Sequence, residues 1–209
     1  MRGKRVPILR RMGTDIHALL EWDAKGDGMP FEEEHWTYSL AYGEMLLSRD
    51  YVAFAAMCGV RASEGCLTPL FAPRGLPSNP GEAVIFRYYR IVEDNFNWTE
   101  SVLPMLPAVS KETARTWVKQ GLAHYGPGMT QWERGNGRRL KEVERRRVSN
   151  PDWHDASWLR PSEFRAAFAH FDYDLAHLAF DWQIMLHTMN EVERLLGSER
   201  VRFVFWFDS

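Results

Sequence analysis

Near its C-terminus the chain reads VRFVFWFD, from Val201 to Asp208. Successive side chains of a β-strand point to opposite faces of the sheet. One face of this segment would carry a valine and three phenylalanines, and the other face would still carry Val204 and Trp206. A strand that is apolar on both faces is typical of the interior of a covered sheet. We therefore expect Val201–Asp208 to be a central strand.

A second alternating segment begins at Thr14. Its even-numbered residues are small or apolar, whereas Asp15 and His17 share the opposite face, which is the period-two pattern of a half-buried strand. We expect this strand to lie beside the C-terminal one. That pairing would bring Asp15 and His17 close to three residues of the last strand, Arg202, Trp206 and Asp208.

Shorter elements are expected between these two strands. Residues 36–40 are rich in aromatic and β-branched side chains, which favours a short strand. Residues 50–57 are rich in small helix-forming residues and are followed by Gly59, so we expect a buried helix there. A further helix is expected at 110–120, with Ser110 as its N-cap.

The longest helical pattern runs from Pro161 to Leu196, with apolar residues recurring every three or four positions. A helix of this length would extend roughly 50 Å at about 1.5 Å per residue, so we expect it to be either kinked or shared with a partner subunit. The predicted fold class is therefore α+β. It comprises a small mixed or antiparallel sheet that includes both terminal strands, packed against a long C-terminal helix and several shorter helices.

The chain of 209 residues is long for one domain and short for two, and we expect a single domain over 1–209. Residues 1–12 are basic and are expected to form a flexible extension. Residues 82–150 are expected to add a helical elaboration. Residues 82–97 fit either a helix or a strand, with the helix favoured by spacing, and a charged helix is expected over 138–148.

Composition narrows the class of protein. The net charge of −2 argues against a surface built for nucleic acid, because such proteins carry a basic excess, and glutamates interrupt the basic residues of 138–148. Cys58 and Cys66 lack a metal-binding spacing and are expected to be reduced thiols. No segment approaches about 18 uncharged apolar residues, and the N-terminus lacks the apolar core of a signal peptide. We expect a cytoplasmic protein with no membrane partner.

Aromatic residues make up 13% of the chain and include nine tryptophans. Large aromatic side chains dominate both protein cores and subunit interfaces. The favoured interpretation is therefore a core together with an interface in a homo-oligomer. The alternative is a dedicated site that stacks a flat ligand.

Two groups of polar residues are candidates for catalysis. Asp15 and His17 share one strand face, and a carboxylate beside an imidazole can bind a metal ion or orient a proton transfer. His154 and Asp155 form a second group before the long helix. If the two groups met, they would suit a divalent metal cofactor (Mg²⁺, Mn²⁺ or Zn²⁺) and a hydrolytic reaction. The alternative is that each histidine hydrogen-bonds to a neighbouring carboxylate, and the spacing alone assigns no cofactor.

A different set of residues is suited to binding an anion. Arg49, Arg61 and Arg74 flank the short helix and a loop rich in proline and glycine, and arginine grips phosphate or carboxylate with two parallel hydrogen bonds. Flat faces for a nucleotide base are offered by Tyr51, Trp158 and Trp206. The alternative is that the arginines anchor the loop to backbone carbonyl groups.

Short blocks follow one another along the chain in a recognisable order: Met12-Gly13-Thr14-Asp15-Ile16-His17, Arg49-Asp50-Tyr51-Val52-Ala53-Phe54, Gly59-Val60-Arg61, Arg74-Gly75-Leu76-Pro77, residues 152–159 and Val201–Asp208. In this order they resemble a family of small bacteriophage proteins without an assigned activity. The likeness is strongest in an N-terminal M-G-x-D-I-H block and a C-terminal V-R-x-V-F-x-F-D block. The resemblance implies phage origin and a role inside an infected bacterium, and it supplies no reaction.

Three functions are compatible with these patterns. The first is a phage accessory protein in the host cytoplasm that binds or sequesters a small anionic, nucleotide-like ligand, with counter-defence as one such role. The second is a metal-dependent hydrolase of a phosphoester that uses the aspartates and histidines. The third is an inhibitor that binds a host protein. The sequence does not decide whether the protein is an enzyme.

Overall fold

The computed structural model describes residues 13–25, 33–34, 36–38, 45–62, 67–93, 108–120, 124–125, 146–149 and 153–208. The predicted extension at 1–12, Cys66 and residues 138–145 of the predicted charged helix lie outside these ranges. The statements below concern the described residues.

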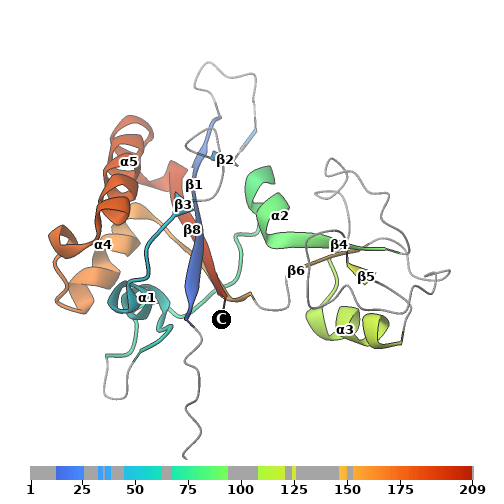
Figure 1. The fold of residues 1–209 in the computed structure, drawn as a ribbon. Coiled ribbons are helices and arrows are strands. Elements are labelled where there is room, and N and C mark those ends of the chain that lie inside the picture. The colour runs from blue at the N-terminus through green and yellow to red at the C-terminus, as the bar shows by residue number, and fades with distance from the viewer. Residues whose placement is uncertain are drawn as a thin grey trace, which may run out of the picture.

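A five-stranded antiparallel sheet forms the centre of the structure (Figure 1). Its main strands, in spatial order, are β2 (Trp36–Tyr38), β1 (Asp15–Asp23), β8 (Val201–Asp208) and β7 (His154–Leu159). The short strand β3 (Met45–Leu46) also pairs with β1.

Strand β8 lies between β1 and β7, as its two apolar faces predict. Its register with β1 runs from Asp15 opposite Asp208 to Trp22 opposite Val201. Every β8 residue from Val201 to Phe207 is buried. The predicted α+β class, with both terminal strands side by side in one sheet, is therefore confirmed.

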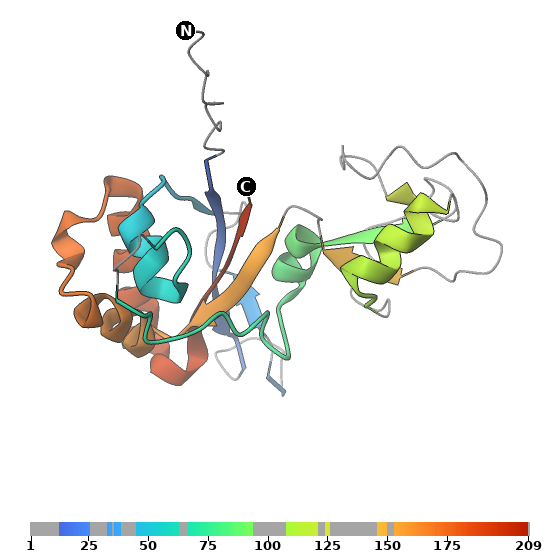
Figure 2. The same ribbon diagram turned by 90° about the horizontal axis from the view of Figure 1, so that it is seen from below.

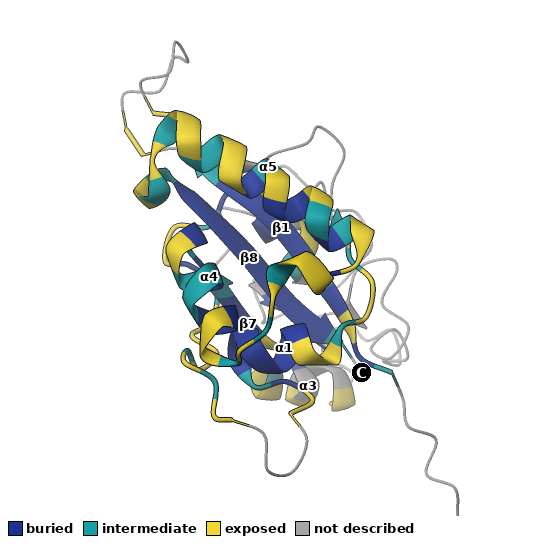
Figure 3. Ribbon diagram, turned by 90° about the vertical axis from the view of Figure 1, so that its left-hand side faces the viewer, coloured by how far each residue is buried: buried dark blue, intermediate teal, exposed yellow. Residues whose placement is uncertain are grey.

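Three helices cover one face of this sheet, which we call the helix face (Figures 1 and 3). They are α1 (Tyr51–Cys58), α4 (Pro161–His170) and α5 (Phe180–Leu196). The sheet contributes Phe203, Phe205 and Phe207 to the core on this side. Large helix side chains with no exposed surface complete it: Phe54, Phe164, Phe168, Trp182 and Met185.

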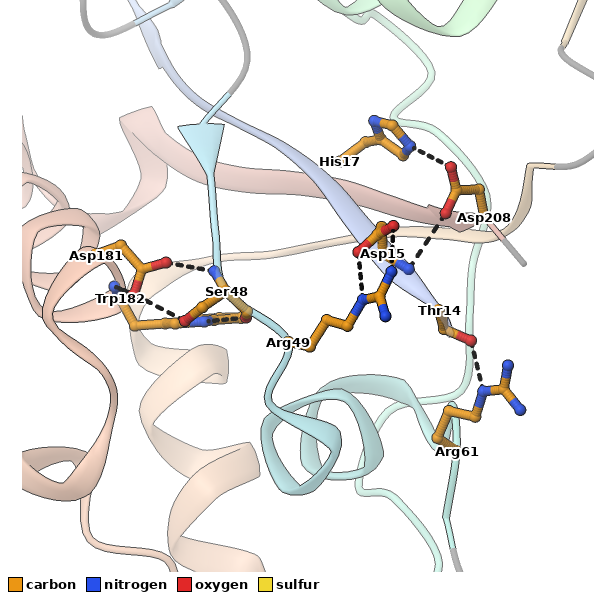
Figure 4. Close-up of polar contacts among 9 residues, drawn as sticks. All are labelled: Thr14, Asp15, His17, Ser48, Arg49, Arg61, Asp181, Trp182 and Asp208. Carbon is orange, nitrogen blue, oxygen red and sulfur yellow. Dashed lines mark hydrogen bonds and ion pairs between the residues drawn. The ribbon is translucent and has the colours of Figure 1, made fainter. Parts of the chain in front are cut away.

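Helix α1 is fixed at both ends and tied to α5. The carboxylate of Asp50 accepts hydrogen bonds from the first free N–H groups of the helix, and Gly59 ends the helix with a φ of 81°, as predicted. Before the helix, Ser48 donates from Oγ to Oδ1 of Asp181 (3.0 Å), and its carbonyl accepts from Nε1 of Trp182 (2.9 Å; Figure 4). These bonds hold the segment that carries Arg49.

The predicted continuous helix from Pro161 to Leu196 is wrong in one respect, because residues 171–179 divide it into α4 and α5. Asp172 adopts a left-handed backbone with a φ of 51°. Asp174 then caps the short 3-10 helix η2 (Leu175–His177) by accepting a hydrogen bond from the Ala176 N–H. The long apolar pattern therefore reflects two helices on one sheet face, which corresponds to the kinked alternative.

The other face of the sheet carries a smaller aromatic core, and we call it the tryptophan face. Trp206 of β8 is fully buried there, and its ring centroid lies 5.2 Å from that of Trp153 and 5.3 Å from that of Tyr88. Tyr88 ends helix α2 (Glu82–Tyr88), which lies on this side of the sheet (Figure 2). None of the helices in the described ranges is long and apolar enough to cross a membrane.

Residues 82–150 are not purely helical. A second antiparallel sheet is formed by β5 (His124–Tyr125), β4 (Tyr89–Glu93) and β6 (Arg146–Ser149). The helix predicted within 82–97 ends at Tyr88 and continues as a strand, and residues 146–148 of the predicted charged helix are also in a strand. Helix α3 (Lys111–Lys119) agrees with prediction, and Oγ of Ser110 accepts a hydrogen bond from the Thr113 N–H.

The loop rich in proline and glycine covers the edge of β7. The N–H of Gly75 donates to the Ala156 carbonyl (2.8 Å), and Nε of Arg74 donates to the Trp158 carbonyl (2.9 Å). Because a bare edge strand is a template for pairing with another chain, covering it favours a defined monomer fold. The role of this loop is therefore structural, because it protects the edge of β7.

At the end of β1 and β8 farthest from Asp15, Glu21 and Arg202 form a buried ion pair of 2.7 Å between Oε2 and Nε. Arg202 also donates to the side chain and the carbonyl of Asn79 and stacks 3.7 Å from the ring centroid of Trp36. The Gly81 N–H donates to Glu21 Oε1 (2.9 Å). Burial raises the pKa of Glu21 and lowers the pKa of Arg202, so for both groups desolvation outweighs their mutual attraction.

Candidate functional site

Polar side chains gather at the other end of the same strand pair, where β1 begins and β8 ends (Figure 4). Arg49 donates two hydrogen bonds to the Asp15 carboxylate, with Nε–Oδ1 and Nη2–Oδ2 distances of 2.5 and 2.8 Å. Asp208 accepts from the Asp15 N–H (3.2 Å) and lies 3.2 Å from Nε2 of His17. Asp15 and His17 are therefore near Asp208, as predicted, whereas Arg202 lies at the opposite end, so its predicted proximity to Asp15 is wrong.

The pKa values of Asp15 and Arg49 are shifted in opposite directions. The hydrogen bonds from Arg49 lower the pKa of Asp15, and the same bonds raise the pKa of Arg49. Both side chains are about half exposed. This arginine is therefore already held by a carboxylate in the two-bond geometry that an anionic ligand would need.

His17 lies on the tryptophan face. Its ring centroid is 5.2 Å from that of Trp153 and 5.9 Å from that of Trp206, to which it is nearly parallel. Asp208 contacts Nε2 at the edge of the imidazole ring, and the Trp206 ring packs against its face, so both contacts orient the ring. This geometry matches the alternative in which the histidine hydrogen-bonds to a neighbouring carboxylate.

His154 and Asp155 lie on the opposite side of the sheet. His154 stacks on Phe207, a residue of the helix-face core, and its Nδ1 lies 2.7 Å from Oδ2 of Asp155. The β7–β8 register shifts by one residue between His154 and Ser157, and Asp155 adopts a φ of 47° at this bulge. The bulge turns the Asp155 carboxylate back toward its neighbour.

The four proposed metal ligands are therefore not brought together. His17 packs against Trp153 and Trp206, and Asp15 binds Arg49, whereas His154 stacks on Phe207 of the helix face and pairs with Asp155. In the part of the chain that the structure describes, no group of three or more histidines, cysteines, aspartates and glutamates is placed to hold a metal ion. The metal hypothesis required these four side chains to meet at one site, and the structure does not bring them together.

A pocket of about 420 Å³ lies where the start of β1, the C-terminal end of α1 and the start of β7 meet. We call it the Arg61 pocket. It is lined by Thr14, Cys58, Gly59, Val60, Arg61, Pro73, His154 and Asp155. Its size falls in the range of about 300 to 1,000 Å³ that is usual for small-molecule sites.

Arg61 lies two residues after Gly59, the C-cap of α1, and has a φ of 58°, a left-handed conformation that is uncommon for a residue with a side chain. Its Nε donates to Oγ1 of Thr14, the residue before β1, and this bond holds the guanidinium near the start of that strand (Figure 4). Asp155 in the opposite wall is also left-handed. Such conformations often mark functional sites.

Two further side chains set the character of the pocket wall. Burial raises the pKa of Cys58 to about 12, so the thiol is protonated at neutral pH and is not a nucleophile. His154 Nε2 is buried and accepts or donates no hydrogen bond within the described residues. The arginine and the carboxylate among the described lining residues are Arg61 and Asp155.

Arg74 does not line this pocket and is held elsewhere. Its two terminal nitrogens donate to both carboxylate oxygens of Glu163 (3.1 and 2.7 Å), and its guanidinium lies 4.2 Å from the Trp158 ring centroid. Burial alone would raise the pKa of Glu163, but the hydrogen bonds from Arg74 and from the Arg160 N–H outweigh it and lower that pKa. Arg74 thus matches the loop-anchoring alternative.

The proposed aromatic platforms are also placed outside the pocket. Trp158 lies under Arg74, Trp206 has no exposed surface, and Tyr51 is 44% exposed with its ring 5.8 Å from that of Phe54. None of the three is among the pocket-lining residues. A nucleotide base would therefore find no stacking surface of the predicted kind there.

Several pocket residues were not predicted from the sequence. Thr14 and Pro73 are ordinary strand and loop residues by type, and only the fold brings them together. Gly59 gave a usable signal, because a glycine that ends a helix fixes where the next side chains emerge. Searches against protein-family models, curated proteins and solved structures find no match to this chain, so the geometry alone carries the functional argument.

Proposed function

We propose that this protein binds a small anionic, nucleotide-like ligand in the Arg61 pocket and holds it without turnover. The observation that carries the proposal is the position of Arg61. Of the three arginines singled out by the sequence, Arg61 lines the pocket and donates from Nε to Thr14, whereas Arg49 and Arg74 each bind a carboxylate outside it. Arginine in such a wall is well shaped to grip phosphate.

The backbone around the pocket supports a binding role. Arg61 and Asp155 are two of the three described non-glycine residues with a positive φ. A left-handed backbone costs a residue with a side chain roughly 1 to 2 kcal/mol. The cost is compatible with a selected function at this pocket, since strain is often retained at binding sites.

The biological setting follows from the sequence resemblance and is part of the proposal. A bacteriophage accessory protein that captures a small anion in the host cytoplasm would remove that molecule from its host receptor or enzyme. Counter-defence is one role of this kind. A homo-oligomer would place several such pockets in one assembly.

The proposal is tested by calorimetric titration of the purified chain with a panel of nucleotides and with inorganic phosphate. Wild type is expected to bind at least one of them. Arg61→Gln should weaken that affinity by about tenfold or more, because a hydrogen-bonded charge is lost. Arg194→Gln, which removes an equal charge from an exposed arginine on α5, should have no effect. Absence of any anion binding, or equal effects of both variants, would sink the proposal.

A hydrolase is the second candidate, supported by the His154–Asp155 pair of 2.7 Å beside Arg61. A carboxylate that orients an imidazole is a common arrangement for a general base. Chromatography of the ligand after prolonged incubation separates the two functions. Intact ligand supports the binder, and a cleaved product that disappears in His154→Gln supports the enzyme.

Binding to a host protein is the third candidate, and one face of α5 supports it. Phe180, Ile184 and Leu195 are 81, 46 and 68% exposed, and their spacing puts them on one side of the helix. Exposed apolar residues of this kind are frequent at protein interfaces. Replacing Phe180 and Leu195 by serine should abolish such an association and leave anion binding in the Arg61 pocket unchanged.

A further inference from the structure

The charges in the Arg61 pocket have both signs, and this restricts the ligand further. Arg61 is a hydrogen-bond donor with a fixed positive charge, whereas Asp155 is a carboxylate in the same pocket. Within the described residues, Oδ2 of the Asp155 carboxylate is hydrogen-bonded to Nδ1 of His154. The Asp155 side chain is 44% exposed, so Oδ1 can accept a hydrogen bond from a bound molecule.

The C-terminal end of α1 lies in the same wall. Cys58 is the last residue of the helix, and Gly59 and Val60 follow it in the pocket lining. The C-terminal end of a helix carries about half a unit of negative charge on its unpaired carbonyl groups. A bare anion would meet this partial charge together with the Asp155 carboxylate, and both repel it.

The pocket is also too large for a bare anion. The five heavy atoms of a phosphate ion, at no more than about 30 Å³ each, fill roughly a third of it. The rest of the 420 Å³ leaves room for a larger molecule, and the Asp155 carboxylate is among the groups that such a molecule would meet. A molecule that fills it should therefore carry hydrogen-bond donors next to its anionic group.

Building on the proposed function, we infer that the ligand is a sugar phosphate, or the ribose–phosphate part of a nucleotide. Its phosphate binds Arg61 and its hydroxyl groups donate to the Asp155 carboxylate. Neighbouring hydroxyls on a sugar are good partners for a carboxylate, as in the acidic residue that binds ribose in dinucleotide sites. Among the described residues that line the pocket there is no tryptophan, tyrosine or phenylalanine, which agrees with recognition of the sugar and not of the base.

Three probes separate the parts of this ligand. Ribose 5-phosphate should bind at least about tenfold more tightly than inorganic phosphate, because it adds hydrogen bonds to a charged acceptor. Ribose alone should bind too weakly to measure by calorimetry, and adenosine monophosphate should bind with an affinity similar to that of ribose 5-phosphate.

The decisive variant is Asp155→Asn, which removes the charge, keeps an acceptor for His154 and suits a left-handed backbone. It should weaken ribose 5-phosphate about tenfold and leave inorganic phosphate unchanged or tighter, because a repulsive charge is lost. Asp172→Asn is the matched control, since Asp172 is an exposed aspartate with a φ of 51° and does not line the pocket. It should change neither affinity.

The outcomes distinguish this inference from the proposed function. Equal affinity for phosphate and ribose 5-phosphate, tighter binding of a zwitterionic amino acid, or no effect of Asp155→Asn overturns the sugar-phosphate assignment and leaves an anion-binding pocket. Binding that requires the base overturns it as well. If no anion binds to wild type, both ideas fail. Urea unfolding of each variant confirms that a lost affinity is not lost folding.

Discussion

The two ends of the β1–β8 strand pair carry similar residue types and use them differently. At the buried end, Glu21 and Arg202 have almost no exposed surface, and hydrogen bonds from Gly81 and to Asn79 complete the network. At the open end, Asp15 and Arg49 are half exposed, and the adjacent Arg61 pocket has two left-handed residues. The buried ion pair at one end holds the fold, whereas at the other end an arginine and an aspartate with left-handed backbones line a pocket.

The largest effect is expected at the buried end. Arg202→Met keeps the volume of the side chain but leaves the Glu21 carboxylate buried without a cation, which should lower the free energy of unfolding by about 3 to 5 kcal/mol. Urea denaturation at pH 7 measures this loss. The double variant Arg202→Met with Glu21→Leu should recover most of it, because both charges are then gone. A double variant no more stable than Arg202→Met would show that the loss does not come from an unpaired Glu21 charge.

The pH dependence of that variant has a definite sign. Burial already raises the pKa of Glu21 in wild type, and removing Arg202 raises it further, above its unfolded value. A carboxyl group with a raised folded pKa is stabilising when protonated, and this contribution is lost as pH rises through the folded pKa. Arg202→Met should therefore regain stability relative to wild type as the solution is acidified.

A moderate effect is expected at the sheet edge, where Arg74 holds the loop against β7. Arg74→Lys keeps the charge but cannot make two parallel bonds to Glu163 while donating to the Trp158 carbonyl. It should lower the free energy of unfolding by about 1 to 2 kcal/mol. Arg194→Lys, in an exposed pair with Glu191, is the control and should change it by less than about 0.5 kcal/mol. Equal losses would mean that the loop anchor is no stronger than a surface pair.

Much of the fold could be predicted because its signals are local. The alternation of Val201–Asp208 predicted an interior strand, and Gly59 marked the C-terminal end of α1. The division of Pro161–Leu196 was missed because Asp172 and Asp174 act through backbone conformations that the apolar spacing does not encode. The spacing describes which face is buried and not whether the axis is continuous.

The pocket was harder to predict than the fold. The sequence singled out Arg61, His154 and Asp155, but it grouped the last two with Asp15 and His17. Strand pairing brings these two groups of residues to the same end of the sheet. The alternation of side chains along each strand and the bulge at Asp155 decide which face of the sheet each side chain reaches. Nothing local to Thr14 or Pro73 signals that they share a wall with these residues.

A smaller effect, with the opposite pH sign, is expected at the open end. The hydrogen bonds from Arg49 lower the pKa of Asp15, so this carboxylate contributes stability above its unfolded pKa, and the contribution is lost as pH falls through the lowered folded value. The stability difference between wild type and Asp15→Asn should be constant near neutrality and vanish well below about pH 4. It should also shrink in high salt, because the pair is exposed. A difference that grows on acidification would contradict the assignment.

The smallest change in stability is expected at Arg61, where binding should be lost completely. Arg61→Gly removes the bond to Thr14 but relieves the left-handed backbone, and these effects should cancel to within about 1 kcal/mol in urea denaturation. Arg61→Ala loses the same bond and keeps the strain, so it should be less stable than the glycine variant by about 1 kcal/mol. Both should fail to bind the anion that wild type binds. A glycine variant as unstable as Arg202→Met would make Arg61 a structural residue, and the contrast between the two ends of the sheet would disappear.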